Sequence, residues 1–483
     1  MRKTLLLLLA ATAVAATALP LTSTAAQPQA LQWGPCPKDV AGTVLECATL
    51  KVPLDYNNPD GRQIDLAVSR LQSKNPEKRR GVLITNPGGP GIAGLNFNII
   101  LAASGVPQEV LDSYDVIGFD PRGIGHSTPV TCNITPEQQK RGLFPAYAHT
   151  DADVDQEAGF SKTIADQCAN SPTAWMLPHV STANNARDID RIREALGEQT
   201  VSYFAPSYGT YLGGVYTTMF AERTDRVVLD SSIGNTGYDV MYMRRFGRGM
   251  QDRFPDFAKF AAARPEYGLG TTPEQVTSKY ADLVRQLEQN PIQGVTATAL
   301  RDSVFQQLYG DSTLPQLAQY LQALDTDQPL PAIAPIPNLE NAMAGRLATI
   351  CGDSNWPESV ADYQRAAAED RQRWPLLGGA TSNISPCAFW PIEPTEAQVQ
   401  IGDQGPSNVL IVQYLRDPGT PLVGAEEMRR ALGRRATMIT VDQGGHAVYP
   451  FSGNTCAIDA VTKYLTTGER PGRDVTCAAQ PGR

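Results

Sequence analysis

The chain has 483 residues, of which 42% are hydrophobic and 19% are charged. A chain of this length and composition can bury a full core, which excludes an intrinsically disordered protein. Asp and Glu outnumber Lys and Arg by 50 to 41, and this acidic balance argues against a nucleic-acid-binding protein. The four histidines are far apart in sequence and no cysteine pair has C-x-x-C spacing, so no local metal-binding motif is present.

Residues 1–26 have the pattern of a signal peptide. Arg2 and Lys3 precede an apolar run over residues 5–18, and the small residues at 23–26 offer a cleavage site. The run is shorter than the roughly 20 residues that span a bilayer, so a retained membrane anchor is the less favoured alternative. We therefore predict that residues 1–26 are removed and that the mature protein is secreted, without stable membrane association.

Export would place the eight cysteines in an oxidising compartment, where disulfides form. Many pairings are possible, and the simplest joins cysteines that are neighbours in sequence. The expected pairs are then Cys36–Cys47, Cys132–Cys168, Cys351–Cys387 and Cys456–Cys477. A catalytic cysteine is a less favoured alternative, because none of the eight lies in a recognisable nucleophile motif.

Short apolar segments alternate with helical patterns over the first half of the chain. Strands are expected over residues 64–68, 82–85, 116–119, 201–204 and 226–230, and helices over 182–196 and 208–221. This alternation predicts an α/β fold with a mostly parallel sheet covered by helices.

The alternation stops near residue 237 and resumes near residue 409. The intervening chain is helical and irregular, with its clearest proline-rich loop over 328–337. Strands are expected again over 409–414 and 437–441, with a helix over 426–432 between them. We predict a core in two parts, residues 27–236 and 406–483, interrupted by a long helical lid over 237–405.

Ser207 lies where a predicted strand meets a predicted helix. The segment Ala205-Pro206-Ser207-Tyr208-Gly209 resembles the G-x-S-x-G nucleophile elbow, with Ala205 in place of the first glycine. Such a sharp turn exposes the serine hydroxyl at the sheet edge, near a helix N-terminus. The alternative interpretation is an ordinary serine in a strand–helix turn.

A glycine-rich loop, Asn86-Pro87-Gly88-Gly89-Pro90-Gly91, directly follows the predicted strand 82–85. In hydrolases with a nucleophile elbow, such a loop supplies one oxyanion donor and the residue after the serine supplies the other, here the N–H groups of Gly89 and Tyr208. Gly89, Gly91 and Gly94 also match a dinucleotide-binding fingerprint, but Pro90 interrupts the turn and export would separate the protein from nicotinamide cofactors. A tight turn without a role is the third interpretation.

Two further candidate residues lie near the end of the chain. Asp417 follows the predicted strand 409–414, and His446 follows the predicted strand 437–441 after two glycines. The order Ser207, Asp417, His446 is that of α/β-hydrolase triads, and the ends of parallel strands meet at one sheet edge. These three residues therefore predict a serine hydrolase.

Several segments together resemble the secreted bacterial tripeptidyl aminopeptidases, α/β-hydrolases that are related to prolyl aminopeptidases. The segments are Thr85–Gly91, Phe119–Ser127, Thr182–Leu196, Ser207–Gly213, Ile350–Asp353, Cys387–Pro391, Asp417–Pro421 and Gly444–His446. The resemblance implies an α/β-hydrolase fold with a helical lid, and an acyl-enzyme mechanism that uses no metal or organic cofactor. The sequence departs from the family pattern at Ala205, at Ser231-Ser232 and at Tyr414-Leu415-Arg416.

An aminopeptidase must also bind the α-ammonium group of its substrate, and a lid carboxylate would serve. The candidates are Glu340, Asp353 and Glu358, each of which could instead be an ordinary solvated side chain. A lid favours short peptides or small molecules over folded proteins. Asp120 and Arg122 match the family's D-x-R-G segment and are interpreted as structural.

Two other functions stay open at this point. One is a secreted esterase or amidase that acts on a small non-peptide metabolite with the same triad. The other is a catalytically silent binding protein on a hydrolase scaffold, to which only Ala205 points.

Overall fold

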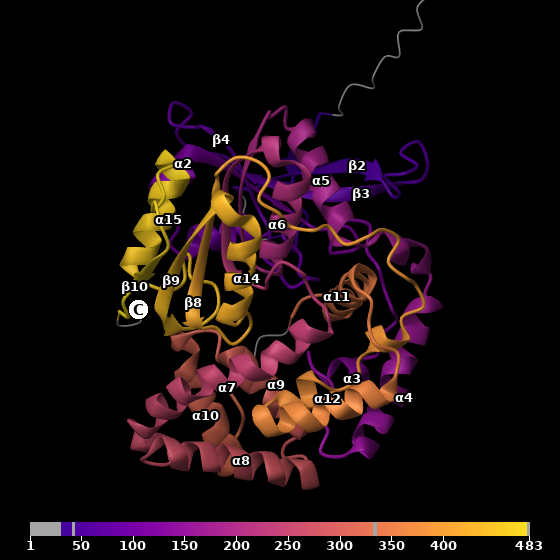
Figure 1. Ribbon diagram of the computed structural model, residues 1–483, viewed down its shortest axis with the longest axis vertical. Helices are drawn as coiled ribbons and strands as arrows, with labels where there is room; N and C mark the ends of the chain where they lie inside the picture. The colour runs from indigo at the N-terminus through magenta and orange to yellow at the C-terminus, as the bar shows by residue number, and fades with distance from the viewer. Residues whose placement is uncertain (1–29, 41–43, 332–335, 481–483) are drawn as a thin grey trace, which may run out of the picture.

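The computed structural model describes residues 30–40, 44–331 and 336–480, and a single sheet forms its centre (Figure 1). In this part of the chain the strand order is β1-β2-β3-β5-β4-β6-β7-β8-β9-β10. The strands are β1 (Gly34–Pro35), β2 (Glu46–Pro53), β3 (Gln63–Leu71), β4 (Gly81–Thr85), β5 (Tyr114–Phe119), β6 (Val201–Ser207), β7 (Thr224–Ser232), β8 (Val409–Arg416), β9 (Ala436–Gly444) and β10 (Val475–Cys477). The pairs β1/β2, β2/β3 and β3/β5 are antiparallel and the other neighbours are parallel, so the mostly parallel sheet is confirmed. The predicted signal peptide lies outside the described residues.

Helices cover both faces of the sheet. One face carries α5 (Thr182–Ala195), α6 (Tyr208–Met219) and α14 (Leu422–Leu432), and the other carries α1 (Phe97–Ala103), α2 (Gln108–Ser113) and α15 (Thr455–Thr467). Successive strand residues point to opposite faces. In β6, Tyr203 and Ala205 belong to the first core and Phe204 to the second, which explains why the central strands are apolar throughout.

The segment between β7 and β8 is helical, and Figure 1 shows most of it gathered in the lower half of the molecule. Its helices are α7 (Val240–Ala262), α8 (Pro273–Gln289), α9 (Ala297–Gln307), α10 (Leu314–Asp325), α11 (Leu339–Asp353), α12 (Val360–Arg373) and α13 (Gly378–Thr381), with short 3₁₀ turns η3 (Pro265–Tyr267), η4 (Asp311–Thr313) and η5 (Pro386–Phe389). Short 3₁₀ turns η2 (Ala221–Arg223) and η6 (Gly433–Arg435) lead into β7 and β9. None of the described residues in this segment forms a strand of the central sheet.

The sequence analysis predicted α5 but missed the helices that lie between β5 and α5. These are α3 (Pro136–Gln139), α4 (Asp151–Ala169) and the 3₁₀ turn η1 (Ala174–His179). Although α4 falls in the predicted core range 27–236, Val154 packs with Tyr363, Ala367 and Ile384 from the segment between β7 and β8. The apolar stripe of α4 is weak because its buried positions include a Ser, a Glu and two small residues as well as Val154 and Ile164.

All eight cysteines are paired, and the pairs are those expected between sequence neighbours: Cys36–Cys47, Cys132–Cys168, Cys351–Cys387 and Cys456–Cys477. A catalytic cysteine is thereby excluded. The Cys351–Cys387 bridge joins the end of α11 to η5. Among the described residues, no helix has the length and apolar character that a membrane span requires.

Candidate active site

Ser207 occupies a strained turn between β6 and α6. It is the last residue of β6, and its φ and ψ are 60° and −131°. A non-glycine residue at positive φ costs about 1–3 kcal/mol, and strain of this kind concentrates at functional sites. A Cβ atom on Gly209 would lie 2.4 Å from the Cβ atom of Ala205, so the methyl group of Ala205 fits because residue 209 is glycine. The departure from G-x-S-x-G therefore leaves the turn intact.

The glycine-rich loop lies directly against this turn. Gly88 has φ 91°, and a Cβ atom there would lie 3.0 Å from Cβ of Ser207 and 3.6 Å from the backbone nitrogen of Tyr208. The carbonyl of the next residue, Gly89, accepts hydrogen bonds from the Tyr238 hydroxyl at 3.1 Å and from Arg346 at 3.3 Å. The loop residue in contact with Ser207 is thus Gly88, the neighbour of Gly89, which is the residue expected to supply the oxyanion donor.

Asp417 and His446 are hydrogen-bonded to each other. His446 Nδ1 lies 2.9 Å from Oδ1 of Asp417, and the side chain of Asp417 is fully buried. The Asp417 carboxylate also accepts the N–H groups of Gly419 and Thr420 at 2.9 and 2.8 Å, which fixes its orientation. Because Nδ1 is engaged with Asp417, Nε2 is the ring nitrogen that remains for proton exchange.

The environment also sets the charge preference of the imidazole. Burial would lower the pKa of His446, but the negative charge of Asp417 and the hydrogen bond to it outweigh burial, so the pKa lies above its ordinary value. An imidazole tuned in this way takes up a proton more readily than free histidine, as a general base must.

The loop that carries His446 is held by residues that the sequence analysis did not single out for this role. Asp230, at the end of β7, accepts the N–H groups of Val448 and Tyr449 at 2.9 and 2.6 Å. The hydroxyl of Ser231 accepts the N–H of Ala447 at 2.9 Å. Ser231, one of the two serines that depart from the family pattern, therefore helps to hold the loop that carries His446. The signal that could have found Asp230 is its place at a strand end, which it shares with Asp417.

A second support for His446 comes from the segment between β7 and β8. The backbone N–H of His446 donates to the carbonyl of Tyr309 at 2.7 Å, and the two ring centroids are 4.5 Å apart. Tyr309 follows α9, so the helical segment contacts the imidazole directly. No periodic pattern in the sequence reveals a backbone acceptor of this kind.

The sheet register places all three residues at one edge. Ser207 is opposite Ser232 on β7, and Arg416, which precedes Asp417, is opposite Gly444 on β9. The strands that end there, β6, β7, β8 and β9, are parallel neighbours. A serine, a carboxylate and an imidazole at the carboxyl ends of parallel strands are the parts of a hydrolytic triad.

The chain is similar to several known proteins. The family model for TAP-like proteins matches residues 375–477, which include Asp417 and His446. The tripeptidyl aminopeptidase of Streptomyces coelicolor is 35% identical to this chain, over 90% of the chain and 83% of that protein. The chain belongs to the tripeptidyl aminopeptidase family. It is accordingly a serine hydrolase with the α/β-hydrolase fold.

Two other similar proteins have names that refer to different activities. The serine protease Hip1 of Mycobacterium tuberculosis is 28% identical over 93% of this chain and 91% of its own length. Carboxylesterase B of the same species is 29% identical over 92% of this chain and 89% of its own length. This chain therefore resembles one protein that is named as a protease and one that is named as an esterase.

The three candidate lid carboxylates have different surroundings. Oε1 of Glu340 accepts the hydroxyl of Thr131 at 2.9 Å and the N–H groups of Cys132 and Ile134 at 2.9 and 3.2 Å, so the loop before α3 occupies it. Glu358 is exposed between α11 and α12. The structure does not bring these two carboxylates into a common site with Asp353.

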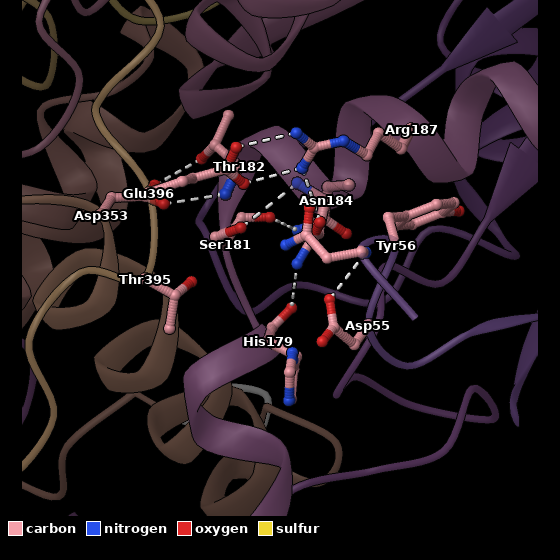
Figure 2. Close-up of polar contacts among 12 residues, drawn as sticks. Asp55, Tyr56, His179, Ser181, Thr182, Asn184, Arg187, Asp353, Thr395 and Glu396 are labelled. Carbon is pink, nitrogen blue, oxygen red and sulfur yellow. Dashed lines mark hydrogen bonds and ion pairs between the residues drawn. The ribbon is translucent and has the colours of Figure 1, made fainter. Parts of the chain in front are cut away.

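Asp353 lies at the end of α11, beside Thr182 at the start of α5 (Figure 2). Its two oxygens accept the N–H and the hydroxyl of Thr182 at 2.8 and 2.5 Å, and the same hydroxyl lies 2.6 Å from the hydroxyl of Tyr208. Burial raises the pKa of Asp353 to about 6. Among the described residues no cation pairs with Asp353, whereas nearby Glu396 is bound at 2.7 Å by both terminal nitrogens of Arg187.

Asp353 and Thr182 line a small cavity, together with Tyr211 and Glu396, which offers about 20 Å³ of space to water-sized molecules. Of the three candidates, Asp353 is therefore the one with a partly buried carboxylate, an adjacent cavity and a polar link to Tyr208.

Asp120 and Arg122 have the contacts of structural residues. Arg122 is buried and binds both oxygens of Asp188 at 2.6 and 2.7 Å. Asp120 accepts the N–H groups of Gly94 and Leu95 at 2.7 and 3.0 Å, which anchors the chain just after the glycine-rich loop.

Proposed function

We propose that the protein is a secreted serine aminopeptidase that releases short N-terminal peptides or single residues through a triad of Ser207, Asp417 and His446. The observation that carries this proposal is the 2.9 Å hydrogen bond between His446 and Asp417 at the sheet edge where Ser207 occupies its strained turn. Identity of 35% to a tripeptidyl aminopeptidase supports the peptidase assignment.

In the proposed mechanism, Ser207 attacks the substrate carbonyl and Nε2 of His446 accepts the hydroxyl proton. Asp417 orients the imidazole and stabilises its charged form. The N–H groups of Gly89 and Tyr208 stabilise the oxyanion, a contribution of about 10²–10³ in rate for each donor. His446 then protonates the leaving amine, and water hydrolyses the acyl-enzyme.

The aminopeptidase assignment is supported by the carboxylate of Asp353. An α-ammonium group needs a buried anionic acceptor, and Asp353 has no cation partner among the described residues. Its hydrogen-bonded link through Thr182 to Tyr208 places it beside the residue that follows the nucleophile. We infer that Asp353 receives the substrate's N-terminus, with residues 237–405 acting as a lid that limits access to short chains.

The test combines active-site labelling with substrate panels. A fluorophosphonate probe should label the wild-type protein, and Ser207→Ala should abolish labelling. Tripeptidyl and aminoacyl chromogenic amides should be cleaved faster than short acyl esters. Asp353→Asn should raise KM for substrates with a free N-terminus but not for N-acetylated ones, whereas the exposed control Glu358→Gln should change neither.

The second candidate is a secreted esterase or amidase that acts on a small non-peptide metabolite. The resemblance to a protein named carboxylesterase B favours it. The same panel decides, because this function would give faster turnover of acyl esters and no dependence on a free N-terminus. Absence of any labelling would point instead to a catalytically silent binding protein.

Secretion is the remaining part of the proposal. The signal-like sequence over residues 1–26 and four disulfides support it. Mass spectrometry of the protein recovered from culture medium should show an N-terminus near residue 27, and recovery of the full-length chain only from cells would contradict it.

A further inference from the structure

A second cavity lies between α4, α11 and the segment before α4. It offers about 110 Å³ of space to water-sized molecules. Apolar side chains form most of its wall: Leu143, Phe144, Phe160, Ile164, Met343 and Leu347. An apolar wall with few polar groups is typical of a site for a small apolar group.

This cavity reaches the proposed catalytic centre through Arg346. Arg346 is part of the cavity wall, and its guanidinium donates to the carbonyl of Gly89 at 3.3 Å. Gly88, one residue earlier, is in contact with Ser207. Helix α11 also rests on the glycine-rich loop, because a Cβ atom on Gly91 would overlap the carbonyl oxygen of Ala342. The part of the cavity wall formed by Arg346 therefore lies beside the glycine-rich loop that is proposed to bind the reacting carbonyl.

The charges around the cavity select against cations. Arg141 and Glu157 neutralise each other through a 2.5 Å ion pair. Arg346 contacts the sulfur of Met243 and the ring of Tyr238. Within the described residues it forms no ion pair, although the buried carboxylate of Asp302 is near enough to interact with its charge. A positively charged substrate group beside Arg346 would meet this guanidinium.

One polar atom of the wall has no partner. The hydroxyl of Ser385 is buried and forms no hydrogen bond with any described residue. A buried hydroxyl without a partner costs free energy, and a bound peptide group would satisfy it.

We propose that this cavity is the subsite for a large, uncharged, apolar side chain of the substrate residue beside the scissile bond. The inference rests on the proposed function and adds a substrate class to it. The aliphatic and aromatic wall favours Leu or Phe, and Arg346 in the wall disfavours Lys. Ser385 hydrogen-bonds the peptide backbone of the same substrate residue.

The experiment uses two series of tripeptidyl amides, one that varies the residue on the acyl side of the scissile bond and one that varies the leaving residue, each with Gly, Leu, Phe and Lys. In one series, kcat/KM for Leu or Phe should exceed that for Gly by about tenfold or more, with Lys below Leu. The series that shows the preference identifies the side of the bond that the cavity serves.

Variants connect the preference to the cavity. Met343→Trp fills the cavity and should reduce the Phe-to-Gly ratio of kcat/KM about threefold or more, which is half of a tenfold preference on a logarithmic scale. Met241→Trp, a matched change at an exposed position of α7, should leave the ratio unaltered. Arg346→Gln should raise the Lys-to-Leu ratio of kcat/KM. This substitution replaces a large side chain by a smaller one, so the fold need not accommodate extra volume.

Each outcome is decisive. Flat profiles in both series, or an unchanged ratio in folded Met343→Trp, would overturn the inference while fluorophosphonate labelling still supported the hydrolase. If Met343→Trp does not fold, the wild-type series and Arg346→Gln decide. Failure of the wild-type protein to react with the probe would overturn the proposed function, and the subsite with it.

Discussion

Gly88 and Ser207 are in direct contact: a Cβ atom on Gly88 would lie 3.0 Å from Cβ of Ser207 and 2.9 Å from the carbonyl oxygen of Pro206. The glycine-rich loop and the elbow therefore form one unit, in which a side chain at residue 88 has no room. This contact links the proposed oxyanion donors to the nucleophile more tightly than either sequence motif implies.

Gly88→Ala should abolish activity and fluorophosphonate labelling, because the added methyl group must displace either the loop or Ser207. Gly105→Ala is the matched control, since Gly105 has φ 94° against 91° for Gly88 but no atom within 4 Å of its would-be Cβ. Both variants carry the same backbone strain, so their difference isolates the contact. Equal labelling of the two variants would contradict the role of this contact.

Asp417→Asn should lower kcat by about 10⁴, because the imidazole would lose the partner that orients it and stabilises its charge. The charge of Asp417 is what lifts the pKa of His446 despite burial, so its removal should lower that pKa. Activity requires neutral His446, and the acid limb of the kcat/KM profile should move to lower pH in the variant. If the acid limb of the profile stays at the same pH in the variant, the limb reports the pKa of a group other than His446.

Glu340→Ala should destabilise the protein without a matching loss of kcat. The change leaves the hydroxyl of Thr131 and two backbone N–H groups without their acceptor, at about 1–3 kcal/mol for each group that stays buried and unpaired. Denaturant unfolding measures the loss, and Glu358→Ala at an exposed position is the control. A large rise in KM for free N-termini, with stability intact, would instead return Glu340 to the list of substrate ligands.

Asp230→Asn should change how stability depends on pH. Burial raises the pKa of Asp230 to about 7, well above that of an unfolded aspartate near 4. The folded state then binds one more proton than the unfolded state between these values, so this residue's contribution to the free energy of unfolding falls as pH rises from about 4 to about 7. Asparagine does not titrate, and the stability of wild type relative to the variant should decline across that window. A constant difference would show that Asp230 ionises in the folded protein as it does when unfolded.

The central strands could be predicted because their residues are apolar on both faces and each strand ends at a loop rich in Gly, Pro or Asp. The same rule located Asp417 and His446, since residues just after parallel strands meet at one edge whatever their separation in sequence. Ser207, at the end of β6, follows the same logic.

Other features of the fold and the site could not be predicted from a single sequence, for physical reasons. The helix α4 has a weak apolar stripe, because its buried face includes Ser161 and Glu157. The contact between the carbonyl of Tyr309 and the N–H of His446 involves backbone atoms, which leave no trace in residue type. Glu340 resembled a ligand by charge alone, and only the folded chain shows that three donors of a neighbouring loop occupy it.

The hydrogen bond from His446 to Tyr309 has a consequence for protein engineering. Since a residue that follows α9 holds the backbone of the imidazole loop, the helical segment cannot be exchanged as an independent module. A chimaera that imports this segment from a relative in order to alter selectivity must reproduce a carbonyl at the position of Tyr309. Transplants designed only around the walls of the two cavities would detach the imidazole that we propose as the general base, although the sequence around His446 would be unchanged.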